Sequence, residues 1–306
     1  MVRRSPRRGM LSAAAAFCED AMIIDFHTHA FPEKVAAAAI QKLRAASHVK
    51  SFTDGTARQL QASMAMAGIG ASLVLPVATH PRQVEKVNDA SIRMNEAGPS
   101  TGVYSFGCMH PDHENPRAEL TRIARAGLKG IKLHPIYQGV DFDDPRYLRI
   151  LERCGELSLA VIIHAGFDVG YPGVERASPA IILRARQAVG QMTLILAHMG
   201  GWRCWDEAET LLPGRGLFID TSFSLGRMTP CGDGYYRDPG ALQLLDDEAF
   251  VRLVRAFGAD HTLFGTDCPW ADQAAALARF RALPLTDAER QAILEDNAAR
   301  LLGIAL

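Results

Sequence analysis

The sequence predicts a single (β/α)8 TIM barrel, and three observations lead to that prediction. Eight short apolar or β-branched runs alternate along the chain with longer segments of helical periodicity, as in parallel strands joined by crossover helices. Most of these runs are almost continuously hydrophobic, which is typical of strands covered on both faces. Polar residues end several of the runs, and the carboxyl ends of the strands form the active-site face of such a barrel.

The predicted strands are, in chain order, 22–27, 71–76, 102–108, 130–135, 160–166, 193–200, 216–222 and 261–267. The predicted helices lie at about 33–46, 54–67, 82–97, 116–127, 145–158, 178–189, 203–212, 247–257, 272–282 and 286–302. Asp54 and Thr286 stand where a side chain can cap the first turn of the next helix. The stretch 224–246 is too long for a simple connection, so we expect a mobile or substrate-covering loop there.

Composition excludes several classes of protein. Of the 306 residues 48% are hydrophobic and 22% are charged, which is enough apolar material for a large buried core. The formal net charge of −1 offers no basic field for a nucleic acid, and no apolar run approaches the roughly 18 residues that would span a membrane. The 6 cysteines form no C-x-x-C pair, which favours reduced thiols and a cytoplasmic location.

We expect one barrel domain over residues 22–306, preceded by an extension of residues 1–21. Several arginines in that extension precede a short apolar run, which loosely imitates a signal peptide. Met22, however, opens the first predicted strand. We therefore interpret 1–21 as a disordered extension or a mis-assigned translation start.

Ionisable side chains gather at the carboxyl ends of the predicted strands. They are His27 and His29 on the first strand, Lys132 and His134 on the fourth, His164 on the fifth, His198 on the sixth and Asp267 on the eighth. His27 and His29 are two residues apart on an extended strand, so both rings should face the barrel interior. Asp25 should share that face and either orient a histidine or satisfy buried backbone donors.

This set of residues predicts a metal site. Three imidazoles and one carboxylate, from His27, His29, His164 and Asp267, suit Zn²⁺ or a similar divalent ion. Such an ion lowers the pKa of a water molecule and polarises a substrate carbonyl. Asp267 is then the expected general base, and His198 should reach the developing oxyanion or the departing group without being a ligand.

Four further residues are candidates for substrate binding. Lys132 could bind a substrate carboxylate or, if carbamylated, bridge a second metal ion, and we favour substrate binding. His134 should face the same way, as a pocket residue rather than a second-metal ligand. Trp202 offers an apolar pocket wall or core packing, and Arg227 either grips an acidic substrate or faces solvent.

The chain resembles the amidohydrolase superfamily, and within it the amidohydrolase-2 group that includes the aminocarboxymuconate semialdehyde decarboxylase-like enzymes. The motifs that carry the resemblance are IIDFHTHAFP, GIKLHP, VIIHAG, LILAHMGG, LFGTDCPW and ILEDNAARLLGI, in that order from Ile23 to the end. The resemblance implies His27, His29, His164 and Asp267 as metal ligands, His198 as the catalytic histidine, and one ion, usually zinc. Lys132 and His134 depart from this pattern, because some branches could use them for a second ion.

The resemblance also implies two reaction types, because the family contains hydrolases of C–N or C–O bonds and nonoxidative decarboxylases. Our first hypothesis is a hydrolase of a small amide, lactone or related carbonyl compound. The alternative is a decarboxylase of a small unsaturated or aromatic acid, and the third is a catalytically silent barrel that acts as a binding protein. In each enzymatic case the expected partner is a small molecule such as a carboxylate, and the resemblance is consistent with a homodimer.

Overall fold

The computed structural model describes residues 22–304, so the expectation for residues 1–21 lies outside the described part of the chain. No helix in this part is both long and apolar enough to span a lipid bilayer. The strands are β1 (Ile24–Thr28), β2 (Ala71–Val74), β3 (Val103–Ser105), β4 (Gly107–Cys108), β5 (Gly130–Leu133), β6 (Ala160–Ile163), β7 (Leu194–Leu196), β8 (Phe218–Asp220) and β9 (Thr262–Leu263). Neighbouring strands pair in parallel, from β1 to β3 and from β4 to β9.

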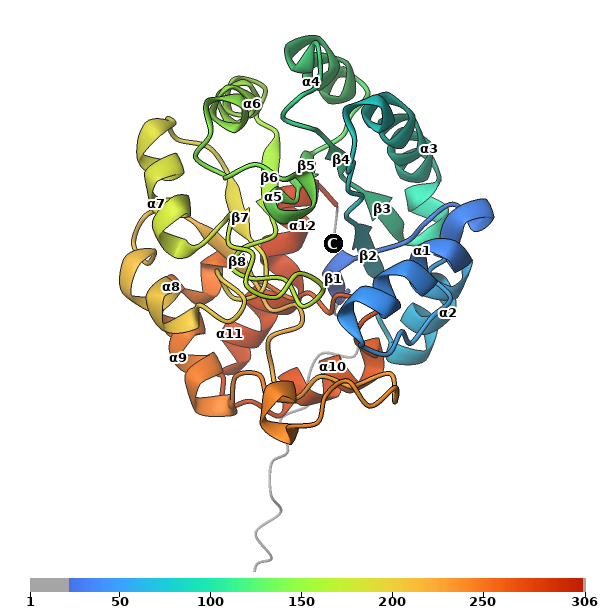
Figure 1. Cartoon of the computed structure of the whole chain (residues 1–306), viewed down its shortest axis with the longest axis vertical. Coiled ribbons are helices and arrows are strands. Elements are labelled where there is room, and N and C mark those ends of the chain that lie inside the picture. The colour runs from blue at the N-terminus through green and yellow to red at the C-terminus, as the bar shows by residue number, and fades with distance from the viewer. Residues whose placement is uncertain (1–21, 305–306) are drawn as a thin grey trace, which may run out of the picture.

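These strands form the closed ring that the sequence predicts (Figure 1). The predicted strand 102–108 is interrupted at Phe106, which gives β3 and β4, and the N–H of Phe106 still donates to the Val74 carbonyl oxygen at 3.1 Å. The ring closes between β9 and β1, because the N–H of Phe26 donates to the Phe264 carbonyl oxygen at 2.7 Å. The eight predicted strands therefore correspond to nine segments of one barrel.

All ten predicted helices are present, and most of them surround the ring of strands in Figure 1. The helices are α1 (Glu33–Ser47), α2 (Ala57–Ala67), α3 (Val84–Thr101), α4 (Pro116–Arg125), α5 (Pro135–Gln138), α6 (Pro145–Glu156), α7 (Pro179–Ala188), α8 (Trp205–Leu211), α9 (Asp247–Phe257), α10 (Gln273–Arg281), α11 (Asp287–Gln291) and α12 (Asn297–Leu302). Three short 3-10 turns, η1 (Pro81–Gln83), η2 (Pro239–Leu242) and η3 (Ala259–His261), and a π-helical turn, η4 (Ala292–Asp296), complete the list. The short helix α5 was not predicted.

One of the two predicted helix caps is wrong. Thr286 caps α11 in a reciprocal capping box with Glu289, as predicted. The cap of α2 is Thr56, whose hydroxyl accepts from the N–H of Gln59 at 3.2 Å. Asp54 lies two residues too early and instead accepts hydrogen bonds from the N–H and hydroxyl of Thr56. The carboxylate of Asp54 thus forms hydrogen bonds with the capping residue Thr56 and not with an N–H group of the helix.

The barrel interior is filled by apolar side chains from strands on opposite sides of the ring. Phe26 of β1, Ile162 of β6 and Ile195 of β7 belong to one buried cluster, and Phe26 meets Phe106 edge to face with ring centroids 5.7 Å apart. Ala298 and Leu302 of α12 join the same cluster. Because apolar side chains fill this part of the barrel, a ligand is expected at the carboxyl ends of the strands, where the polar residues lie.

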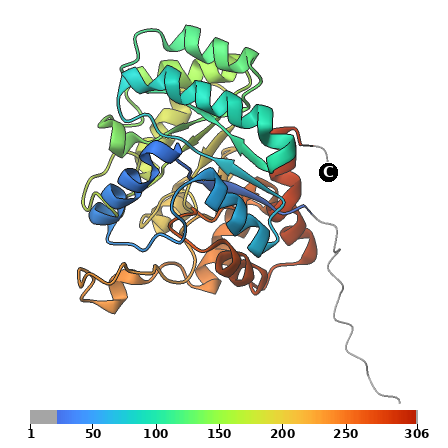
Figure 2. The same ribbon diagram turned by 90° about the vertical axis from the view of Figure 1, so that its right-hand side faces the viewer.

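The long segment that follows β8 folds back on itself and leaves the body of the barrel, where it is drawn in orange in Figure 2. Its two limbs meet at isolated bridges between Leu225 and Leu245 and between Arg227 and Gln243. The chain after α1 runs beside it, since the N–H of Lys50 donates to the Thr229 carbonyl oxygen at 2.9 Å. The segment between α1 and α2 and the segment after β8 are therefore joined by a backbone hydrogen bond.

Candidate active site

His27 and His29 come from the end of β1, and both rings approach Asp267. Nε2 of His29 lies 3.1 Å from Oδ1 of Asp267, and Nε2 of His27 lies 3.5 Å from the same oxygen. Asp267 follows β9 with a left-handed φ of 69°, and its N–H donates to the His27 carbonyl oxygen at 2.8 Å. The first and last strands of the barrel thus bring together three of the four side chains expected to bind a metal ion.

Asp25 does not share the face of these histidines, so that expectation is wrong. Its Oδ2 accepts from the Gln273 side chain of α10 at 2.7 Å and from the Thr266 hydroxyl at 2.6 Å. Its Oδ1 accepts from the N–H groups of Thr266 and His27. The pairing of β1 with β2 shifts register between Asp25 and Thr28, which interrupts the simple alternation of faces. Asp25 therefore satisfies buried backbone donors, the second of its two expected roles.

The hydrogen bonds of His27 and His29 fix which nitrogen carries the proton. Nδ1 of His29 lies 2.9 Å from the Leu75 carbonyl oxygen, and Nδ1 of His27 lies 2.7 Å from Oδ2 of Asp220. Because a carbonyl oxygen and a carboxylate accept, each Nδ1 donates and each Nε2 keeps its lone pair. Nε2 of His27 is buried and has no hydrogen-bond partner among the described residues. Two open imidazole nitrogens and a carboxylate oxygen converge, which fits a divalent metal ion.

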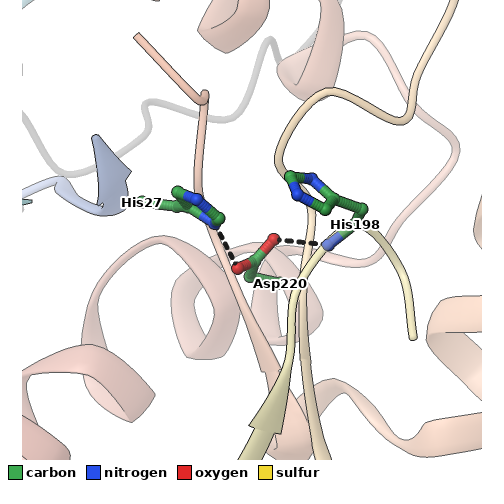
Figure 3. Close-up of side chains that lie close together, drawn as sticks. All are labelled: His27, His198 and Asp220. Atoms are coloured by element: carbon green, nitrogen blue, oxygen red, sulfur yellow. Dashed lines mark hydrogen bonds and ion pairs between the residues drawn. The ribbon is translucent and has the colours of Figure 1, made fainter. Parts of the chain in front are cut away.

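His198 follows the strand β7 and is held by Ser222 and by Asp220, the second of which is drawn with it in Figure 3. The N–H of His198 donates to Oδ1 of Asp220 at 3.0 Å, while Nδ1 of its ring lies 3.1 Å from the Ser222 carbonyl oxygen. The His198 backbone has a left-handed φ of 60°. The indole N–H of Trp205 donates to the His198 carbonyl oxygen at 3.0 Å, so the backbone N–H and the carbonyl oxygen of His198 are both hydrogen-bonded. The ring centroids of His198 and His27 lie 5.1 Å apart.

His164 is not in the group formed by His27, His29 and Asp267. Its Nε2 lies 2.8 Å from the Phe167 carbonyl oxygen and its Nδ1 lies 3.0 Å from Nε2 of His198. His164 instead belongs to a second group of potential ligands, with His134 and Asp168. Nε2 of His134 and Nε2 of His164 lie 3.5 and 3.7 Å from Oδ2 of Asp168, and the two rings stack at 4.2 Å.

His134 has a structural constraint that the sequence did not reveal. Its Nδ1 accepts from the N–H of Tyr137, so His134 caps the short helix α5. An accepting Nδ1 places the ring proton on Nε2, which faces Asp168. This tautomer makes His134 a hydrogen-bond donor toward Asp168 rather than a metal ligand.

Lys132 is fully buried at 1% exposure, and its Nζ has no hydrogen-bond partner among the described residues. Burial lowers its pKa from 10.5 to about 8, while the carboxylates of Asp220, Asp267 and Asp168 act in the opposite direction. The ammonium group is therefore still mostly protonated at neutral pH. A buried cation without a partner is costly, so an anionic group that approached Lys132 would bind favourably.

The buried imidazoles are neutral. Burial lowers the pKa of His27, His134 and His198 well below its usual value, and Lys132 lowers all three further. Burial likewise lowers the pKa of His164 to about 3. Burial raises the pKa of Asp267, and the neighbouring His29 and Lys132 act in the opposite direction. Neutral imidazole is the form that binds a metal ion.

Trp202 and Arg227 do not join these histidines. Trp202 is buried against Phe223 and Met228, and its indole N–H donates to the Phe223 carbonyl oxygen at 3.2 Å, which matches the packing alternative. The Arg227 side chain is exposed on the segment that leaves the barrel, which matches the solvent-facing alternative. Both residues lie away from the histidines for the same reason: they are on the loops after β7 and β8, and these loops pack on each other.

Sequence reasoning missed Asp220, Ser222 and Asp168. Asp220 ends the seventh predicted strand, so the signal that singled out the other strand ends was present in the run GLFIDTS. Ser222 follows on the same face two residues later. Asp168 lies four residues after His164 in an irregular loop, where periodicity gives no information about direction.

Comparisons with known proteins agree with this architecture. The sequence profile of the family described as Amidohydrolase matches residues 24–304. No curated protein sequence matches the chain significantly. Among solved structures, an uncharacterised TIM-barrel protein from Bordetella bronchiseptica is similar with a TM-score of 0.70 and 19% identity, over 92% of this chain and 98% of that one.

Two similar structures carry functional names. The putative 2-pyrone-4,6-dicarboxylic acid hydrolase from Pseudomonas putida has a TM-score of 0.60 and 20% identity, over 93% of this chain and 98% of that one. The 5-carboxyvanillate decarboxylase from Novosphingobium aromaticivorans, solved with bound manganese, has a TM-score of 0.63 and 14% identity, over 94% and 98%. At such identities the likeness shows the fold.

Proposed function

Because the chain belongs to the amidohydrolase family, whose profile spans residues 24–304, we propose that it is a metal-dependent hydrolase of a small carbonyl compound such as an amide or a lactone. The family comprises metal-dependent enzymes of two kinds, hydrolases and decarboxylases, and similar structures of both kinds share this fold. The residues at the strand ends supply the groups that either reaction needs.

One observation carries the proposal: Nε2 of His27, Nε2 of His29 and Oδ1 of Asp267 converge at the end of the barrel. We propose these three as ligands of a divalent ion. His164 is the proposed fourth ligand, through Nδ1, because its Nε2 is engaged by the Phe167 carbonyl oxygen. We propose Zn²⁺ because nitrogen-rich sites with one carboxylate suit it, although the same donors accept Mn²⁺.

When bound, such an ion polarises the substrate carbonyl and lowers the pKa of the attacking water. Asp267 is the proposed acceptor of the water proton, because burial raises the pKa of this carboxyl group above that of an exposed aspartate. The resulting hydroxide adds to the carbonyl carbon, the bond from that carbon to the departing nitrogen or oxygen breaks, and the proton passes to the departing atom. His198 is the proposed carrier for that transfer.

The tautomer of His198 sets the order of these steps. Its Nδ1 donates to the Ser222 carbonyl oxygen, so the neutral ring has a lone pair on Nε2. His198 must therefore accept a proton before it can give one to the departing group. A histidine with its proton on Nε2 would instead donate a hydrogen bond to the oxyanion from the first step.

The unpartnered ammonium group of Lys132 supports a substrate that carries a carboxylate. We propose that Lys132 binds this carboxylate and that His134 donates a hydrogen bond to the same ligand from Nε2. The same observation favours the second candidate function, decarboxylation of a small unsaturated or aromatic acid. In that reaction the bond to the carboxylate carbon breaks, CO₂ leaves, and a proton takes its place on the substrate carbon.

A substrate screen tests the proposed reaction. The zinc-loaded protein would be offered lactones, amides and unsaturated or aromatic acids, with acid release and CO₂ release followed in parallel. Hydrolysis without CO₂ supports the first candidate, and CO₂ release from an acid supports the second. Inertness toward both sets by a fully metal-loaded protein would contradict the proposal.

Asp267→Asn tests the role of the carboxylate. We expect kcat/KM to fall at least about 100-fold, because the amide cannot accept a proton. Asp287→Asn, at an exposed position in the first turn of α11, is the control and should keep full activity. Turnover close to that of the wild type in the folded Asp267→Asn variant would eliminate this mechanism.

A further inference from the structure

We infer that Asp220, together with Ser222, fixes the ring proton of His27 on Nδ1 and thereby determines how tightly the site binds a metal ion. This inference rests on the proposed metal site. It assigns Asp220 a positioning role, because its fully buried carboxylate contacts the proposed ligand His27.

The two carboxylate oxygens of Asp220 have different partners. Oδ1 accepts three hydrogen bonds, from the N–H of His198 at 3.0 Å, the N–H of Ser222 at 3.0 Å and the Ser222 hydroxyl at 2.5 Å. Oδ2 faces Nδ1 of His27 at 2.7 Å. Asp220 is fully buried, so water cannot replace any of these partners. Its orientation is therefore fixed by the backbone N–H groups of His198 and Ser222, and Figure 3 shows the first of these hydrogen bonds.

This orientation leaves His27 only one tautomer. Oδ2 is an acceptor, so Nδ1 of His27 must carry the proton and Nε2 must keep the lone pair. Nε2 is the buried nitrogen that has no partner among residues 22–304. A carboxylate behind an imidazole in this way also raises the basicity of the ligating nitrogen. Asp220 thus prepares His27 for a cation.

Ser222 extends the same constraint to His198. Its hydroxyl hydrogen is engaged by Oδ1 of Asp220, so its oxygen can only accept from the two rings beside it. Nδ1 of His27 and Nδ1 of His198 each lie 2.9 Å from this oxygen. Both rings are therefore held with the proton on Nδ1. One buried carboxylate and hydroxyl pair sets the tautomers of a proposed ligand and of the proposed proton carrier.

The three donors on Oδ1 make the effect of Asp220→Asn unusual. Only an amide oxygen can occupy the Oδ1 position, so the amide nitrogen must occupy the Oδ2 position and donate to Nδ1 of His27. The proton of His27 then moves to Nε2, which blocks the lone pair. In Asp220→Ala the Ser222 hydroxyl can rotate and can still accept from Nδ1 of His27, so the useful tautomer remains accessible. The isosteric variant should therefore bind metal more weakly than the truncated one.

The test is the affinity of the full-length protein for Zn²⁺, measured by competition with a chromophoric chelator. We expect about 10-fold weaker binding for Asp220→Ala and at least about 100-fold weaker binding for Asp220→Asn. Ser224→Ala removes a second buried hydroxyl two residues from Ser222, one that donates to the Ser222 carbonyl oxygen, and is the matched control. A purely structural role predicts the opposite order, because the alanine variant loses more contacts, and that order would overturn the inference.

A second measurement covers the case in which a variant does not fold. The ¹⁵N chemical shifts of histidine-labelled, metal-free wild-type protein report the tautomer of each ring directly. We expect the His27 signals, identified by their loss in His27→Gln, to show the proton on Nδ1. A proton on Nε2 would overturn the inference. A wild-type protein that binds no Zn²⁺ but shows the Nδ1 tautomer would reject the proposed metal site and leave the role of Asp220 standing.

Discussion

Nε2 of His198 lies 3.0 Å from Nδ1 of His164, and each ring uses its other nitrogen to donate to a main-chain carbonyl oxygen. Both facing nitrogens of the neutral rings therefore carry lone pairs, and the two lone pairs repel each other. A cation between or beside them removes this repulsion. Removal of the metal should therefore lower the free energy of unfolding in two ways, because the contacts between the metal and its ligands are lost and the repulsion between the two lone pairs returns.

Replacing His198 by Gln in the metal-free protein tests this repulsion. The side-chain amide of Gln can donate to Nδ1 of His164, so we expect the free energy of unfolding to stay within about 1 kcal/mol of the wild type. His198→Phe has similar size but offers no donor to that nitrogen, so it should be less stable than His198→Gln by about 1 kcal/mol. Urea unfolding in the presence of EDTA measures both. A phenylalanine variant as stable as the glutamine variant would refute the repulsion.

Lys132→Met should change the pH dependence of stability. Because the pKa of Lys132 is about 8 in the folded protein and 10.5 when exposed, the unfolded chain binds more protons between these pH values. The free energy of unfolding of the metal-free wild type should therefore rise with pH across this window, by about 3 kcal/mol relative to Lys132→Met. Urea unfolding of both proteins from pH 7 to pH 10.5 measures the difference.

The same variant should be at least as stable as the wild type at pH 7, because it no longer buries an unpaired charge. Its KM for carboxylate substrates should nevertheless rise. Lys129→Met, at an exposed lysine just before β5, is the control and should shift stability by less than about 0.5 kcal/mol with no pH dependence. Equal pH dependence in wild type and Lys132→Met would show that Lys132 is not desolvated.

Gly265→Ala should weaken metal binding without any change to a ligand. A Cβ atom on Gly265 would lie 2.8 Å from Cβ of His27, which has no freedom to move away from its strand. We expect the ring of His27 to be displaced and the affinity for Zn²⁺ to fall about 10-fold or more. Gly190→Ala is the control, because a Cβ there meets nothing within 4 Å. Wild-type affinity in Gly265→Ala would mean that the position of His27 is not critical.

The sequence predicted the barrel, its strands and the meeting of His27, His29 and Asp267, because hydrophobic runs and polar strand ends are local features. It did not predict that Asp25 turns toward α10, since a register shift depends on how β1 pairs with β2. The split at Phe106 and the cap at Thr56 were missed for similar reasons. Both depend on neighbouring backbone rather than on residue type.

The sequence also could not show that His164 lies with His134 and Asp168. Which nitrogen of a ring faces the site depends on the rotation of the ring, and the Phe167 carbonyl oxygen sets that rotation here. Asp220 was within reach of the same strand-end argument, but its partner His27 lies 193 residues away. Its role becomes visible only when the hydrogen bonds on both of its oxygens are known.

The central claim is that a divalent ion binds between the first and last strands of the barrel. The most direct measurement is an anomalous difference map at the zinc absorption edge from crystals grown with Zn²⁺. We expect a peak about 2.0–2.2 Å from Nε2 of His27, Nε2 of His29 and a carboxylate oxygen of Asp267. A fully loaded crystal with no peak there, or with its peak confined to His134 and Asp168, would contradict the claim.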